Sequence, residues 1–307
     1  MRTVAPDYYR EFRCIANKCR HSCCIGWEID IDSATREKYR HVTGAFGVRL
    51  NAAIDDGEDV SCFRLGENDR CPMLNANGLC DLITALGEEN LCQICADHPR
   101  FRSYFSGRIE VGLGLCCEEA ARLILTSEDP MRLVTLEDDG MGEELSDDEA
   151  DLLSLRAELI ALMQDRTRSI EDRLETLLDA VDFTIPDRDW VHVYRHLERL
   201  DPTWDSVLDM LAHRGFSGRP SAVFDTAFEQ FCVYLLYRHL PGALEDDDIP
   251  GRVAFCVLST RVLMTLCAAS KNCGIDDLLD FARMYSAEIE YSEDNIAALL
   301  DALYEVE

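Results

Sequence analysis

Apolar residues recur at helical spacing through the second half of the chain. Leu152, Leu155, Leu159 and Leu162 follow the 3.6-residue period that is typical of one face of a helix. The same spacing predicts further helices that begin near residues 170, 190, 203, 276 and 293. Two more segments, 222–240 and 252–268, are apolar on nearly every side. We therefore expect these two helices to pack together at the centre of a bundle.

The first 125 residues have a different pattern, in which short apolar pieces are interrupted by Gly, Asn, Asp and Cys. Only segments 33–39 and 118–125 have clear helical spacing, and Asp32 or Ser33 can cap the first of them. Residues 110–115 are expected to form a short strand. The pattern predicts a mainly α protein in which an irregular, cysteine-rich metal-binding module precedes an α-helical bundle.

An acidic stretch separates the two patterns. Residues 128–151 contain 11 acidic residues and one arginine, with only scattered apolar positions. Such a composition is typical of a linker or an exposed hinge. We therefore expect three parts: a cysteine-rich module over 1–127, an acidic linker over 128–151 and an α-helical domain over 152–307.

The formal net charge of −29 narrows the choice of partners. Nucleic acid is excluded as a partner because binding to its phosphates is driven by Lys and Arg, and an anionic membrane surface would repel the chain. A basic protein partner remains compatible with this charge. The start of the sequence has no apolar leader, and no run of about 18 apolar residues is present. We expect a soluble, cytoplasmic protein.

Cysteine content changes the picture most. The chain has 15 cysteines, and 11 of them lie at or before Cys117. In a reducing compartment such density favours thiolates that bind metal over a disulfide framework. The cysteines form four groups at ligand-like spacing: Cys14, Cys19, Cys23 and Cys24; Cys71 and Cys80; Cys92 and Cys95; and Cys116 and Cys117.

These groups supply more thiols than one tetrahedral ion can use. They suit one iron–sulfur cluster plus structural thiols, or two sites, and zinc is the alternative metal. His21 and His98 are available as minority ligands. The remaining cysteines need not bind anything, since most fall on apolar helix faces where cysteine acts as a small hydrophobe; they are Cys62, Cys232, Cys256, Cys267 and Cys273.

Together these motifs resemble the flagellin lysine N-methylase family, which is itself similar to small zinc- or iron-chelating proteins. The resemblance is carried by F-x-C-x4-C-x3-C-C-x2-W-x-I-x-I-D, C-P-M-L with G-L-C, L-G-E-x2-L-C-x2-C-x2-H-P-R and C-x-E-A-A-R-L-I-L. It continues in FEQFCVYLLYRHL and RVAFCVLSTRVLMTL, and so covers most of the chain.

The resemblance implies a protein-lysine N-methyltransferase that uses S-adenosylmethionine, contains a [4Fe-4S] cluster and acts on flagellin. The cysteines that match the family's motifs are Cys14, Cys19, Cys23, Cys24, Cys71, Cys80, Cys92, Cys95 and Cys117. Cys116 stands where the family usually has serine, and Glu118 where it usually has proline.

Residues for the methyl transfer itself are less marked. A target lysine must lose its proton, which aromatic and carboxylate neighbours can assist. Trp27 and Asp30 follow the first cysteine group and are candidates by position, while Asp32 is expected to cap a helix. The chain has no glycine-rich nucleotide-binding turn. Two alternatives to a methyltransferase therefore remain: a metal-chelating or electron-transfer module, and a metal-structured interaction protein.

Overall fold

A computed structural model describes residues 1–58, 60–214 and 221–305. The chain divides into two compact units, Arg13–Phe101 and a larger one made of Met1–Phe12 together with Arg102–Glu307. The division therefore differs from the predicted boundaries at residues 127 and 152. Residues 102–127 belong to the larger unit because their strand pairs with the start of the chain and their helix packs on the later helices.

The smaller unit is built from short elements around one apolar core. The core includes Ile29, Ile31, Tyr39, Leu50 and Phe63, all buried. A three-stranded antiparallel sheet, in the order β2-β4-β3, covers part of it. The elements are η2 (Ala16–Lys18), β2 (Asp30–Ile31), α1 (Ser33–Arg40), α2 (Gly44–Ala52), β3 (Ile54–Asp56), β4 (Ser61–Phe63), η3 (Glu67–Asp69), α3 (Asp81–Leu86), η4 (Glu88–Asn90) and α4 (Gln93–Asp97).

Helix α1 begins as its sequence predicts. Asp32 is the N-cap, and its Oδ1 accepts a hydrogen bond from the Thr35 backbone N–H at 2.9 Å. The other carboxylate oxygen accepts from the Gln93 N–H at 2.9 Å. Although partial burial opposes ionisation, these backbone donors outweigh it and lower the pKa of Asp32. The predicted capping role of Asp32 is confirmed, and the same carboxylate also holds the start of α4.

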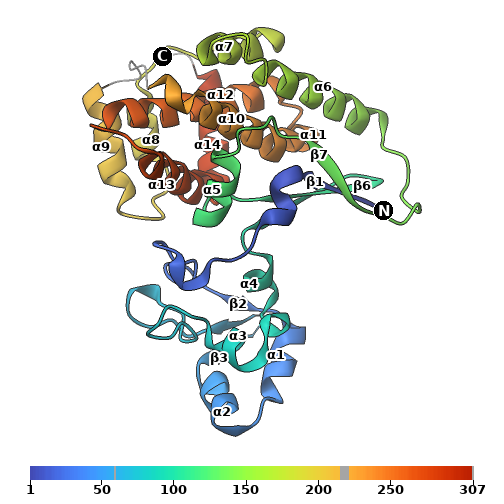
Figure 1. The fold of residues 1–307 in the computed structure, drawn as a ribbon, viewed down its shortest axis with the longest axis vertical. Helices are drawn as coiled ribbons and strands as arrows, with labels where there is room; N and C mark the ends of the chain where they lie inside the picture. Colours follow the sequence, from blue (N-terminus) through green and yellow to red (C-terminus); the bar gives the residue numbers. More distant parts are fainter. Residues whose placement is uncertain (59, 215–220, 306–307) are drawn as a thin grey trace. The chain divides into compact units, whose positions relative to one another are not determined.

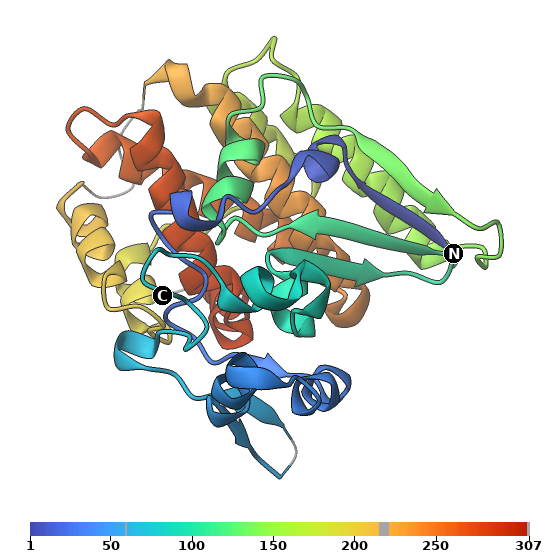
Figure 2. The same ribbon diagram turned by 60° about the horizontal axis from the view of Figure 1, so that its bottom comes forward.

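A four-stranded sheet organises the larger unit, in the order β5-β6-β1-β7. Strand β1 (Arg2–Pro6) pairs in parallel with β6 (Arg108–Leu113) and antiparallel with β7 (Leu133–Asp138). Figure 2 shows β1 between these two partners. The boundary between the units falls within the edge strand β5 (Arg100–Tyr104). The predicted strand over 110–115 is confirmed as β6, which begins and ends two residues earlier.

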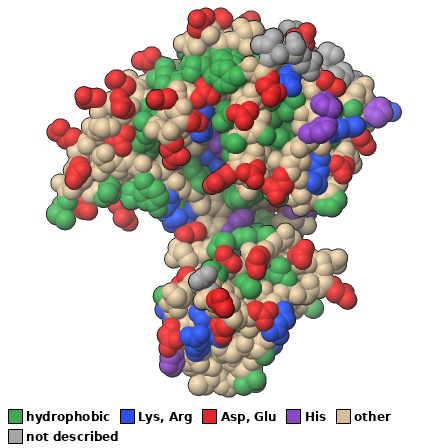
Figure 3. Space-filling view, turned by 180° about the vertical axis from the view of Figure 1, so that it is seen from behind, with side chains coloured by type: hydrophobic (Ala, Val, Ile, Leu, Met, Phe, Trp, Pro, Cys, Tyr) green, Lys and Arg blue, Asp and Glu red, His purple; other side chains and the backbone are tan. Residues whose placement is uncertain are grey.

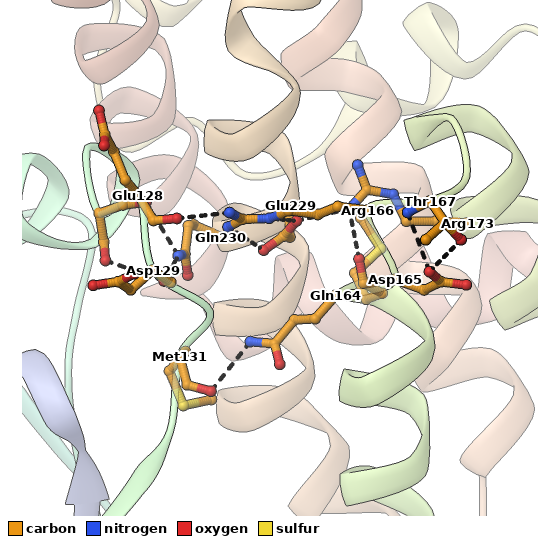
Figure 4. Close-up of polar contacts among 12 residues, drawn as sticks. Glu128, Asp129, Met131, Gln164, Asp165, Arg166, Thr167, Arg173, Glu229 and Gln230 are labelled. Atoms are coloured by element: carbon orange, nitrogen blue, oxygen red, sulfur yellow. Dashed lines mark hydrogen bonds and ion pairs between the residues drawn. The ribbon is translucent and has the colours of Figure 1, made fainter.

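The stretch expected to be an acidic linker is partly ordered into the larger unit. It contains β7, and a capping box between Ser146 and Glu149 starts the next helix within it. Side chains of the bundle also fasten its beginning, since the Gln230 amide donates to the carbonyl oxygens of Ser127 at 3.2 Å and Asp129 at 2.7 Å (Figure 4). A free linker over the whole of 128–151 is therefore not what the structure contains.

The rest of the larger unit is helical, as predicted from the apolar spacing (Figure 1). Two of its helices, α10 (Asp225–His239) and α12 (Ile249–Ala269), pack against each other at the centre. Its further elements are η1 (Asp7–Glu11), α5 (Glu118–Leu125), α6 (Asp147–Met163), α7 (Ile170–Ala180), α8 (Trp190–His196), α9 (Trp204–Arg214), η5 (Ala222–Phe224), α10 (Asp225–His239), η6 (Leu240–Gly242), α11 (Ala243–Asp246), α12 (Ile249–Ala269), α13 (Ile275–Tyr285), the π-helical η7 (Ser286–Glu290) and α14 (Glu293–Tyr304).

Helix α12 is long enough and apolar enough to cross a membrane. In this protein 78% of its most apolar window is buried inside the fold. The partners that bury it include α9, α10, α13 and α14. Helix α12 therefore has the environment of a core helix.

Charged groups buried in the bundle are paired. Glu229, fully buried on α10, accepts hydrogen bonds from Arg166 at 2.8 and 2.9 Å and from Arg173 at 2.7 Å (Figure 4). Arg166 also donates to the Glu128 carbonyl oxygen at 2.7 Å. This network joins α10 to the start of α7 and to the segment before β7. Unpaired, a buried carboxylate would cost several kcal/mol.

A second buried carboxylate lies in the π-helical turn η7. Glu290 accepts hydrogen bonds from Tyr234 Oη at 2.9 Å and from His239 Nε2 at 2.6 Å, and Arg238 Nε lies 3.5 Å away. Burial alone would raise its pKa, but the charge of Arg238 and the His239 hydrogen bond outweigh burial and lower the pKa of Glu290 to about 2. The group is therefore held as a carboxylate.

Many other carboxylates lie on the surface. The face drawn in Figure 3 has Asp and Glu side chains scattered over both units rather than gathered in one place. The negative charge of the chain is therefore spread over its surface on this face.

Candidate functional site

Five cysteines of the smaller unit pack on its single apolar core. Cys71 and Cys92 are buried, and Cys24, Cys80 and Cys95 are partly buried against the same residues. They come from three of the four groups in the sequence. Among the described residues, which include all 15 cysteines, no disulfide is present. The fold therefore gathers separate cysteine motifs as free thiols around one centre.

Backbone contacts explain how the first two of these motifs meet. The Cys71 N–H donates to the Cys24 carbonyl oxygen at 2.9 Å, which joins the first motif to the second. Within the second motif, Leu74 and Cys80 form an isolated β-bridge. The turn between them is closed by the Gly78 N–H bonding to the Asn75 carbonyl oxygen, with Gly78 at a φ of 73°. A glycine turn therefore lies between Cys71 and Cys80.

The third motif places its two thiols together. Cys92 is the N-cap of α4 and Cys95 lies in its first turn, so the two side chains point to the same side. A hydrogen bond from Cys95 lowers the pKa of Cys92, and the same bond, with burial, raises the pKa of Cys95. One proton is therefore shared between two sulfurs, which favours a single thiolate at this pair.

The remaining thiols also influence one another. A hydrogen bond from Cys23 lowers the pKa of Cys24 to about 7, whereas burial raises the pKa of Cys71 to about 11. Ionised Cys24 would disfavour ionisation of Cys71, Cys80 and Cys95. Several thiolates can coexist at such a centre only when a cation compensates their charge.

The centre fits a metal group in the chemistry of its donors but not in their geometry. Among the described residues, no three His, Cys, Asp or Glu side chains are close enough to hold a metal ion, so the predicted metal module is not established by the geometry. The chemistry of the donors does fit, since they are thiols that have no disulfide partner. In addition, His98, one turn after Cys95, has a buried Nε2 without a hydrogen-bond partner. Burial lowers the pKa of His98 to about 4, so the ring is neutral and Nε2 can accept a bond.

The other predicted ligands do not pack on this core, although Cys23 hydrogen-bonds to Cys24, which does. Cys14 and Cys23 are exposed and Cys19 is partly exposed, on the segment around η2; the Cys14 thiol accepts a hydrogen bond from the Ala16 N–H at 3.4 Å. Cys117 is the N-cap of α5 in the larger unit. Its neighbour Cys116 bonds to the Tyr291 hydroxyl, and burial raises the pKa of Cys116 to about 12.

A pocket of about 450 Å³ opens in the smaller unit directly after the first cysteine motif. Its wall includes the ring of Trp27, whose Nε1 donates to the Cys23 carbonyl oxygen at 2.5 Å. The ring also lies 6.0 Å from that of His98, measured between centroids. The pocket is lined by Gly26, Trp27, Glu28, Asp55, Cys62, Phe63, Arg64, Leu65 and Asp69.

Acidic groups dominate the polar lining of this pocket. Of its three carboxylates, Asp55 is paired with Arg64, which leaves Glu28 and Asp69 as negative charge without a cationic partner in the lining. Cys62 hydrogen-bonds to Glu28; burial, followed by this bond, raises the pKa of Cys62. The thiol is therefore protonated and acts as a donor. An aromatic wall beside carboxylates suits a cationic side chain.

The two candidates proposed by position separate in the structure. Trp27 lines the pocket, whereas Asp30 lies exposed on β2 and is not part of the lining. Glu28, Asp55, Cys62 and Asp69 were not predicted as site residues. Sequence spacing has no signal for them, because strand pairing between β3 and β4 brings residues 55 and 62 together. Cys62, expected to have no role, is a lining residue.

Comparisons with known proteins give partial relatives. No protein-family model and no solved structure matches the chain. The chain is 29% identical over 137 residues to a lysine-N-methylase of Salmonella typhimurium, and equally so to one of Salmonella choleraesuis. This match covers 42% of the chain and 33% of each relative, so the chain spans about a third of their length. It is 26% identical over 141 residues to the flagellar biosynthetic protein FliU of Salmonella muenchen, covering 42% of the chain and 79% of that protein. These similarities agree, at a distance, with the resemblance read from the cysteine motifs.

Proposed function

We propose that this protein is a methyltransferase that N-methylates lysine side chains of flagellin or of another lysine-bearing protein, with S-adenosylmethionine as the methyl donor. The names of its relatives, lysine-N-methylase and FliU, point to this activity. The observation in the structure that carries the proposal is the pocket with Trp27 beside unpaired carboxylates, because its chemistry suits a lysine side chain.

The pocket residues have opposing effects on the reacting amine. Glu28 and Asp69 attract the lysine ammonium and so select the substrate, but they also favour the protonated form. The face of the Trp27 ring also attracts the ammonium, but the same contact removes water from the charge, and this desolvation favours loss of the proton. Methyl transfer forms a bond between nitrogen and the methyl carbon as the bond from that carbon to sulfur breaks. The nitrogen must first lose a proton, which the pocket carboxylates can accept.

We further propose a [4Fe-4S] cluster as the metal group, with zinc as the alternative, held by thiolates chosen from Cys24, Cys71, Cys80, Cys92 and Cys95. Such a cluster supplies electron transfer when bound. The free thiols on one core and the partnerless His98 Nε2 support the proposal. We also propose that the protein acts in the cytoplasm, because thiols remain free of disulfides in a reducing compartment.

The test is a methylation assay on the full chain, purified without oxygen. The protein is incubated with S-adenosylmethionine, a reductant and purified flagellin, and lysine peptides are analysed by mass spectrometry for hydrogen replaced by methyl. Methylated lysine that requires both protein and donor is the expected result. If a preparation with its full metal content leaves every lysine unmodified, the methyltransferase proposal fails and a metal-chelating or electron-transfer module becomes the better description.

A further inference from the structure

Two histidines meet on the outer face of α8 in the larger unit. His192 and His196 are both exposed, and their ring centroids are 4.1 Å apart. They are four residues apart, the spacing at which side chains on a helix are neighbours. Neither belongs to the thiol centre or to the pocket, and both lie outside the cysteine motifs.

The tautomer of His196 is fixed by the helix itself. Its Nδ1 lies 2.8 Å from the His192 carbonyl oxygen, and because a carbonyl only accepts, Nδ1 must carry the hydrogen. Nε2 of the neutral ring is then left with a lone pair. Metal-binding histidines commonly use this arrangement, in which one ring nitrogen donates to a carbonyl and the other binds the ion.

We propose that His192 and His196 form a bidentate surface site for a divalent transition metal ion that favours imidazole, such as Ni²⁺, Cu²⁺ or Zn²⁺. The fit follows from the ligand type, since neutral imidazole suits these ions whereas carboxylates suit Mg²⁺ and Ca²⁺. With only two protein ligands, water completes the coordination and the ion exchanges readily. The net charge of −29 raises the local concentration of cations.

Binding is coupled to the helix. Helix α8 has only seven residues, and its rings meet at this spacing only while the helix is formed. An ion that binds the formed helix therefore stabilises it by mass action. Added metal should slow hydrogen exchange at the amides of α8 specifically.

Two other histidines provide matched controls. His41 and His213 are also exposed, and each has Nδ1 near the carbonyl oxygen four residues earlier, at 2.8 and 2.6 Å. The residue at that earlier position is Glu37 or Asp209 rather than histidine. They keep the single-ring geometry but lack the second imidazole.

The experiment measures retention of the untagged full chain on immobilised Ni²⁺, which reaches exposed ligands. His192→Ala and His196→Ala are each expected to weaken Ni²⁺ binding about a hundredfold, because the second ring acts as a tethered ligand. The loss in the double variant should be far smaller than the product of the two single losses, which is the signature of a chelate. His41→Ala and His213→Ala should behave as the parent, and circular dichroism checks that each variant folds.

Three results would overturn the proposal: a parent chain that passes unretained, a His196→Ala variant retained like the parent, or an equal loss in His213→Ala. Hydrogen exchange supplies a second readout. Protection of α8 by Ni²⁺ in the parent and in His213→Ala, but not in His192→Ala, is the expected pattern. Equal protection in all three would assign the effect to other ligands.

Discussion

The indole Nε1 of Trp27 donates a hydrogen bond to the carbonyl oxygen of Cys23, 2.5 Å away, and this bond joins a wall of the pocket to the first cysteine motif. This hydrogen bond orients the Trp27 ring in the wall of the pocket. Any side chain that enters the pocket therefore contacts a residue whose orientation depends on the cysteine-rich segment.

Replacing this ring should weaken substrate binding. In Trp27→Ala, loss of a cation–π contact with the lysine is expected to cost about 0.5–2 kcal/mol, or roughly 2- to 30-fold in KM for a lysine-containing flagellin fragment. Trp27→Phe should lie between parent and alanine variant. Metal content is measured in parallel, because Trp27 also packs on the core. An unchanged KM with normal metal content would contradict a role for Trp27 in substrate binding.

Charge in the pocket predicts a salt effect. Glu28→Gln and Asp69→Asn should each raise KM for the lysine substrate and flatten its increase with ionic strength, since screening acts on charge pairs. Glu37→Gln, on the exposed face of α1, is the matched control and should retain the salt dependence of the parent. If KM rises equally with ionic strength in all variants, the pocket carboxylates do not attract the substrate.

The thiol centre predicts which cysteines retain metal. Serine at Cys24, Cys80 or Cys95 is expected to lower the iron content and the visible absorption of protein purified without oxygen, because serine is a poor ligand for iron–sulfur clusters. Cys62→Ser should keep its iron, since this thiol lines the pocket and bonds to Glu28. Full iron content in all three ligand variants would exclude the centre. Stoichiometric zinc without iron in the parent would select zinc.

Buried and exposed ion pairs should differ in stability. Glu229→Gln leaves Arg173 buried without its counter-charge and is expected to lower the free energy of unfolding by about 3 kcal/mol. Glu175→Gln breaks the exposed pair with Arg261 and should cost less than about 1 kcal/mol. Urea unfolding followed by circular dichroism compares them. Equal losses would mean that the network in Figure 4 does not stabilise the bundle.

Acid should remove the contribution of Glu290. The pKa of Glu290 in the folded protein is lowered to about 2, below the usual value near 4.3. The ionised group therefore stabilises the fold fully at pH values above about 4.3, and this contribution is lost as the pH falls toward 2. Glu290→Gln should therefore be less stable than the parent at pH 7, and the difference should shrink between about pH 4.3 and 2. Urea unfolding across this range measures it. A difference independent of pH would contradict the assignment.

Local signals in the sequence were sufficient for most helices. Asp32 indicated where α1 begins. The nearly all-apolar character of α10 and α12 predicted that they pack together. Of the larger unit's sheet only β6 was predicted, and its pairing was missed, since β1 pairs with strands that begin more than a hundred residues later. The acidic composition around β7 also concealed a strand whose side chains are mostly exposed.

The residues of the candidate site were likewise predicted only in part. Cysteine spacing marked the thiols that meet on the core, and Trp27 was marked by its place after them. Asp55 and Cys62 could not be identified, because their proximity depends on the pairing of β3 with β4. Asp69 reaches the pocket through a left-handed backbone, with a φ of 53°, which has no reliable sequence signal.

The central position of β1 sets an order of events during synthesis. Residues 2–6 leave the ribosome before both of their partner strands, which lie beyond residue 107. At about 5–20 residues per second, the first strand waits on the order of ten seconds for a partner. In that interval the whole of Arg13–Phe101 emerges and can assemble on its own core. The thiols of this centre can thus come together before the sheet closes, while β1 is still unpaired.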